Sequence, residues 1–72
     1  MPKLPRDLSG ARVARALERA GFVETHRVGS HRTYRRGSLV TTVPMHRVVK
    51  PGTLHGILRD TALTVDRLLD LI

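Results

Sequence analysis

Residues 22–44, FVETHRVGSHRTYRRGSLVTTVP, decide the fold, because β-branched residues recur here between two evenly placed turn signals. In Gly29-Ser30 and Gly37-Ser38 a glycine precedes a small polar residue, which is typical of a two-residue hairpin turn of type II′. The stretch therefore predicts a three-stranded antiparallel meander. We expect its strands at 22–28, 31–36 and 39–43, with Pro44 ending the third.

Helical periodicity lies on both sides of this meander. Ser9 as an N-cap and Gly21 as a terminator predict a first helix over 9–20. A second helical region over 52–71 should be broken near Ala62, with Thr64 capping its last part. The predicted fold class is α+β, in the order α-β-β-β-α, with the helices packed on one face of a three-stranded antiparallel sheet, because so short a chain cannot cover both faces. Residues expected in the common core are Val13, Leu17, Leu54, Ile57, Leu58, Leu68 and Leu69.

The charge balance indicates a polyanionic partner. Lys and Arg number 13 against 6 Asp and Glu, which gives a formal net charge of +7. Eleven of these basic residues are arginine, whose planar guanidinium matches the geometry of phosphate. We favour nucleic acid over an acidic protein partner or a surface that only keeps the protein soluble. Because aromatic residues make up only 3% of the chain, recognition through backbone and shape is expected rather than base stacking.

Composition also indicates the cellular compartment and the number of domains. The chain has no cysteine and no apolar run near the ~20 residues needed to span a bilayer, so we expect a cytoplasmic protein. We expect one domain over 1–72, with an extended arm at 1–7.

The sequence also limits the possible chemistry. It offers no close acid pair, no phosphate-cradling glycine loop and no Cys/His set with zinc spacing. Four histidines remain as the side chains that titrate near neutral pH.

Among the histidines, His31 is the candidate for catalysis. It follows the Gly29-Ser30 turn, begins the second predicted strand, and has several arginines nearby. RNA carries its own nucleophile, the ribose 2′-OH. Its cleavage needs a base for that proton, an acid for the leaving 5′-oxygen, and positive charge on the phosphate. On the residues alone, an ordinary surface or hydrogen-bonding histidine beside a turn is the stronger interpretation.

A longer pattern resembles the HicA toxin family. Its parts are individually weak, but they occur in order from Leu4 to about Leu69 and are specific as a series. They are Leu4-Pro5, Ser9-Gly10, Gly21-Phe22, Gly29-Ser30-His31 with Tyr34, Val43-Pro44-x-His46, and Pro51-Gly52-Thr53-Leu54-x-x-Ile57-Leu58-Arg59.

The resemblance implies an mRNA interferase, that is, an endoribonuclease of a type II toxin–antitoxin system. Such a toxin has a fold similar to the double-stranded-RNA-binding domain, acts on RNA without a metal or cofactor, and is blocked by a HicB antitoxin. The resemblance also implies that His31 is the catalytic residue. The loop 45–51 departs from many relatives in length and in Val48-Val49, so the role of His46, as a structural residue or as the general acid, stays open. The residues expected to bind substrate are Gly29, Ser30, Arg27, Arg32, Arg35 and Lys50.

Two other classes of protein remain open. A non-catalytic double-stranded-RNA-binding or ribosome-associated module has no need of a titrating group at position 31. A DNA-binding regulator has less support, because no helix-turn-helix pair with a polar recognition helix is visible. A stripe of Arg12, Arg15 and Arg19 on the first predicted helix is compatible with phosphate contact and equally with a solvated face.

Overall fold

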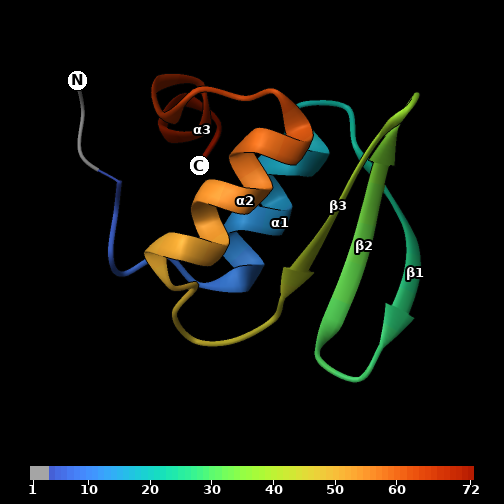
Figure 1. The fold of residues 1–72 in the computed structure, drawn as a ribbon, viewed down its shortest axis with the longest axis horizontal. Coiled ribbons are helices and arrows are strands. Elements are labelled where there is room, and N and C mark those ends of the chain that lie inside the picture. Colours follow the sequence, from blue (N-terminus) through green and yellow to red (C-terminus); the bar gives the residue numbers. More distant parts are fainter. Residues whose placement is uncertain (1–3) are drawn as a thin grey trace.

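The computed structural model describes residues 4–72. Its strands form one antiparallel sheet in the order β1-β2-β3, and the helices gather on one side of it (Figure 1). The predicted α+β class, the α-β-β-β-α order and the single covered face are thereby confirmed. Residues 4–7 of the expected arm form neither helix nor strand, and 1–3 lie outside the described residues. The elements are α1 (Gly10–Arg19), β1 (Val23–Val28), β2 (His31–Arg36), β3 (Leu39–Pro44), α2 (Pro51–Thr61) and α3 (Val65–Leu71).

Both hairpins turn at the predicted dipeptides. Gly29 and Gly37 have φ angles of 57° and 60°, while among residues 4–72 Ala62 is the one non-glycine residue with positive φ. A positive φ at the glycine alone is the sign pattern of a type II′ turn. These turns fix the register, which places His31 opposite Val28 in β1 and opposite Pro44 in β3.

Helix α1 has defined ends. The Ser9 side chain accepts the backbone N–H of Arg12 at 3.2 Å, as an N-cap does. After the helix Gly21 adopts a φ of 96°, and the N–H of Phe22 donates to the carbonyl of Leu17 at 2.9 Å. This is a Schellman ending, and Gly21 terminates the helix as predicted. It folds Phe22, which is 2% exposed, back into the core.

The helical region after the sheet is broken as predicted. Ala62 ends α2 in the left-handed conformation with a φ of 59°, and the Thr64 side chain accepts the N–H of Arg67 at 3.1 Å to begin α3. Helix α3 packs against α1, where a guanidinium N–H of Arg19 donates to the carbonyl of Leu71 at 2.8 Å. None of the helices in residues 4–72 is long and apolar enough to cross a membrane.

One predicted core residue is wrong. Leu69 is 41% exposed, whereas Leu68 and Leu71 of the same helix are buried. Successive residues of an α-helix are rotated by about 100°, so a helix that packs on a single neighbour buries only a narrow stripe. Helix α3 turns Leu68 and Leu71 inward, and Leu69 therefore faces solvent.

The core lies between the helices and one face of the sheet. Tyr34 of β2 and Val43 of β3 are 1% and 0% exposed on that face. The opposite face is open, with Val23 and Val28 more than half exposed. Because side chains alternate along a strand, His31, three residues before Tyr34, belongs to the open face. Packing thus leaves His31 free at the edge of an uncovered surface.

Candidate active site

The turn at Gly29-Ser30 determines where His31 stands. Gly29 adopts a positive φ at little cost because it has no Cβ, and His31 follows as the exposed first residue of β2. The carbonyl of Ser30 accepts the N–H of Met45 at 2.6 Å. The turn is therefore tied directly to the segment that follows β3.

The loop after β3 is held in place by the start of α1. The N–H of Gly10 donates to the carbonyl of His46 at 2.9 Å, and the N–H of Val49 donates to the carbonyl of Leu8 at 2.7 Å. Val49 is itself 1% exposed, so burial fixes the same segment. A Cβ atom at Gly10 would lie 2.7 Å from the Cα atom of Met45. A glycine at this position lets the helix approach the loop closely enough to make these contacts.

These contacts bring a second histidine to His31. The ring centroids of His31 and His46 are 6.0 Å apart, and the ring planes meet at 70°. Nε2 of His46 lies 3.3 Å from Oγ of Ser30, a hydrogen bond in which either atom can donate according to the tautomer. The imidazole of His46 thus joins the hydroxyl and the imidazole of the adjacent residues Ser30 and His31 in one cluster.

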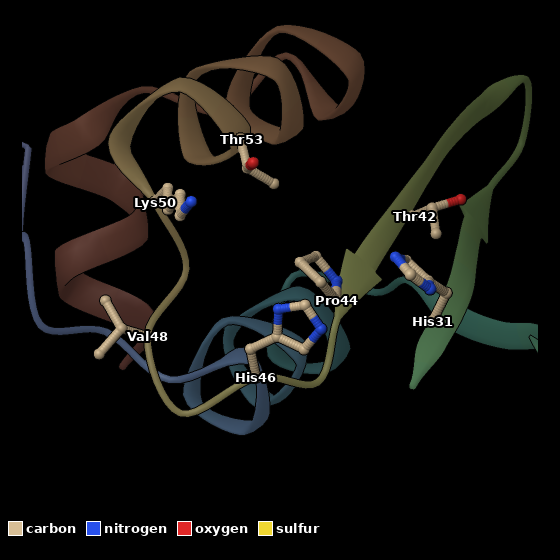
Figure 2. Close-up of a pocket in the computed structure, with 7 residues that line it drawn as sticks. All are labelled: His31, Thr42, Pro44, His46, Val48, Lys50 and Thr53. Atoms are coloured by element: carbon tan, nitrogen blue, oxygen red, sulfur yellow. The ribbon is translucent and has the colours of Figure 1, made fainter. Parts of the chain in front are cut away.

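A pocket of about 400 Å³ opens beside this cluster, between the end of β3 and the first turn of α2 (Figure 2). In Figure 2 the ring of His31, a ring nitrogen of His46 and the amino group of Lys50 are turned toward this space. Its size falls within the range of about 300–1,000 Å³ usual for ligand sites. The lining residues are His31, Thr42, Pro44, His46, Val48, Lys50 and Thr53.

The electrostatics of the pocket favour an anion. Lys50 precedes α2 without forming a side-chain cap, and Pro51 begins the helix. Pro51 has no N–H, and the N–H of Leu54 donates to the carbonyl of Lys50 at 2.9 Å. The N–H groups of Gly52 and Thr53 are left for another partner, at the positive end of the helix dipole. One ammonium group, two imidazoles and a helix N-terminus surround the same space, an arrangement suited to a phosphate group.

The three arginines expected at the site lie outside the pocket lining. A β-bulge between Glu24 and His26 places Arg27 beside Glu24, and the guanidinium donates to that carboxylate at 3.0 and 3.1 Å. This hydrogen bonding lowers the pKa of Glu24 and raises that of Arg27. Arg32 lies opposite Arg27 across the hairpin. Arg35 shares the open face with His31, about 13 Å further along β2.

Of the expected site residues, His31 and Lys50 line the pocket, Ser30 contacts the lining residue His46, and Gly29 lies in the supporting turn. Thr42 and Thr53 line the pocket and were not singled out from the sequence. The position of His46 follows from a signal in the sequence, since the register of the second hairpin sets Pro44 opposite His31.

The remaining titratable residues do not join the cluster. His26 lies in β1, and His55 is exposed on α2. Within the described part of the chain, no three side chains of His, Asp or Glu are grouped as a metal ion would require. The pocket itself presents two imidazoles with the ammonium group of Lys50.

The fold and the pocket define a class, namely a small basic α+β domain with one open sheet face and two histidines that line a pocket beside a lysine and a helix N-terminus. The model of the family described as HicA toxin of bacterial toxin-antitoxin matches residues 10–63, more than half of the chain. The chain belongs to this family, and the resemblance read from its motifs is confirmed. It is a toxin of a toxin–antitoxin system, and an antitoxin is its partner. Comparison with curated proteins finds no match.

Proposed function

We propose that this toxin is an mRNA interferase, a metal-independent endoribonuclease in which His31 acts as general acid or base on the ribose 2′-OH. The observation that carries the proposal is the His31 ring facing a pocket beside the ammonium of Lys50 and the uncapped first turn of α2. A phosphate in this pocket lies next to an imidazole and among positive charges. RNA cleavage requires acid–base catalysis and positive charge on the phosphate once the substrate supplies the nucleophile, and the pocket places an imidazole and positive charge together.

The reaction is an internal transfer of the phosphoryl group. The 2′-oxygen gives up its proton and attacks the adjacent phosphorus, so that a P–O2′ bond forms as the P–O5′ bond breaks. The products are a 2′,3′-cyclic phosphate and a 5′-hydroxyl. Lys50 and the N–H groups of α2 stabilise the negative charge on the non-bridging oxygens. DNA lacks the 2′-OH and is not a substrate of this chemistry.

The surfaces around the pocket suggest how the substrate is held. Arg35 lies on the open face with His31, and Arg27 and Arg32 lie side by side on the β1–β2 hairpin. We assign Arg35 to a phosphate that flanks the scissile one. Arg27 and Arg32 face the other side of the sheet from His31, and we assign them to phosphates of RNA that passes around the end of the hairpin. Gly29 and Ser30 keep the hairpin turn narrow at the point where the RNA strand approaches it. An mRNA substrate places the reaction in the cytoplasm, and a HicB-like antitoxin stops it by covering the pocket.

Cleavage assays with two histidine variants test the proposal. His31→Ala should lower the cleavage rate by about 10²–10⁴, while fold and RNA binding stay close to wild type. His26→Ala is the matched control, because His26 is an exposed strand histidine outside the pocket, and it should cut normally. Cleavage should persist in EDTA, and a substrate with 2′-deoxyribose at the cut site should resist it.

Two results would contradict the proposal. Wild-type cleavage by His31→Ala removes the assigned role of His31, and cleavage of the 2′-deoxy substrate removes the assigned nucleophile. If the wild-type toxin binds RNA but cuts none, a non-catalytic RNA-binding module explains the basic surface better.

A further inference from the structure

We propose that His46 is the second catalytic residue, the general acid that protonates the leaving 5′-oxygen, and that Ser30 is a positioning residue that orients its ring. The inference rests on the proposed ribonuclease function and adds a partner to His31. Three observations carry it: the separation of the two rings, the hydrogen bond from His46 to Ser30, and the pocket that both rings face.

The reaction needs two separate groups. The attacking 2′-oxygen and the leaving 5′-oxygen lie on opposite sides of the phosphorus, so one imidazole cannot reach both at the same moment. The centroids of His31 and His46 are 6.0 Å apart. Both rings line the same pocket, so a phosphoryl group lying in that pocket in front of them can present one of these oxygens to each ring. Each ring then serves one of the two oxygens.

The contact with Ser30 fits the role of an acid for His46. A protonated imidazole is a donor at both nitrogens. In His46 the Nε2–H group then donates to Oγ of Ser30, 3.3 Å away. The Nδ1–H group remains free for the leaving oxygen, and Figure 2 shows a ring nitrogen of His46 turned toward the pocket. On this basis we assign the acid to His46 and the base to His31.

The protons balance in this scheme. His31 takes the proton of the 2′-OH as the P–O2′ bond forms, and His46 gives its proton to the 5′-oxygen as the P–O5′ bond breaks. After one turnover His31 carries the additional proton and His46 has lost one. Exchange with water restores both rings before the next cut.

The backbone keeps His46 in position for this role. Its carbonyl accepts the N–H of Gly10 at 2.9 Å, and its neighbour Met45 donates to the carbonyl of Ser30 at 2.6 Å. The side chain itself is exposed and fills no part of the core. An exposed side chain on a fixed backbone, aimed at an anion pocket, fits a reacting group better than a packing residue.

A substrate with a modified leaving group tests the assignment. Replacing the bridging 5′-oxygen by sulfur gives a thiolate leaving group, which departs without protonation. On ordinary RNA His46→Ala should cut about 10²–10⁴ more slowly than wild type. On the 5′-thio substrate its rate should return to near the wild-type value. Ser30→Ala should lose less on ordinary RNA and should also recover, because it acts through His46.

Two controls define the comparison. His31→Ala should stay slow on both substrates, since sulfur in the leaving group does not replace a base. His55→Ala should match wild type on both, because His55 is exposed on α2 and does not line the pocket. Circular dichroism of each variant verifies the fold before rates are compared.

The outcomes separate this inference from the proposed function. If wild type does not cut RNA, or His31→Ala cuts normally, the proposed function fails. If wild type cuts RNA and His31→Ala does not, the proposed function holds, and the remaining variants test only the assignment of His46 as the acid. It is overturned when His46→Ala cuts ordinary RNA at the wild-type rate, or when the 5′-thio substrate leaves its defect unchanged. A Ser30→Ala defect that the 5′-thio substrate leaves unchanged overturns the positioning role.

Discussion

Substituting alanine for Gly10 tests whether α1 positions the candidate active site. The added Cβ would lie 2.7 Å from the Cα of Met45 and 2.9 Å from the carbonyl carbon of Pro44. Both are backbone atoms, so no side-chain rotation relieves the overlap. Overpacking of this kind costs typically about 1–3 kcal/mol. Loss of the hydrogen bond from Gly10 to the His46 carbonyl adds roughly 1 kcal/mol, and the better helix propensity of alanine returns up to about 1 kcal/mol.

We therefore expect Gly10→Ala to destabilise the toxin by about 1–3 kcal/mol, and a shift of roughly 4–8 °C per kcal/mol makes the change visible in Tm. Urea and thermal unfolding followed by circular dichroism measure it. The control is Gly56→Ala in α2, where the nearest atom is the Arg59 guanidinium at 3.8 Å. Gly56→Ala should raise the free energy of unfolding of the toxin by up to about 1 kcal/mol, because alanine favours the helix more than glycine does. A Gly10→Ala toxin as stable as wild type would refute the close approach of helix and loop.

Three further predictions concern the surface and the core. A HicB-like antitoxin should protect His31 from solvent in the complex, and a silent complex with His31 open would require another mode of inhibition. RNA affinity should fall steeply with salt, and replacing Arg12, Arg15 and Arg19 by glutamine should reduce the log–log slope by about 2 if each contacts a phosphate; an unchanged slope assigns the stripe to solvent. Burial raises the pKa of Tyr34, so its stabilising contribution is complete below a pH of about 10 and is lost as pH rises through the folded pKa. Urea unfolding at alkaline pH should show a smaller loss for Tyr34→Phe than for wild type, and an equal loss would contradict the assignment.

Most of the fold is predictable because the residues that begin and end its helices and strands act through local interactions. Gly29 and Gly37 specify their turns by a backbone angle, and Ser9 and Gly21 specify the ends of α1 by hydrogen bonds within a few residues. The packing partner of α3 is not encoded in this way. Its i, i+3, i+4, i+7 pattern is equally consistent with a wide or a narrow buried stripe, and only the position of α1 decides that Leu69 is left outside.

The candidate site is predictable to the extent that it follows the strand register. Its sequence signal is the Gly29-Ser30-His31 motif, and the pocket includes His31 and Lys50. The ion pair of Arg27 with Glu24 cannot be predicted from the regular alternation of side chains along a strand. Positions 24 and 27 lie on opposite faces of a regular strand, but the bulge between Glu24 and His26 adds one residue and brings them together. The carboxylate that partly neutralises Arg27 is therefore visible only in the structure.

The placement of His46 shows how the two hairpins build the site. A two-residue turn at 37–38 pairs position 36 with 39, so each step back along β2 moves one step forward along β3 and reaches Pro44 opposite His31. The residues after Pro44 must then pass the Gly29-Ser30 turn, where Met45 donates to the Ser30 carbonyl and His46 meets the Ser30 hydroxyl. Lengthening either turn by one residue would shift this register. The short turns therefore matter to the site as much as the histidines, because they bring the two rings within 6.0 Å.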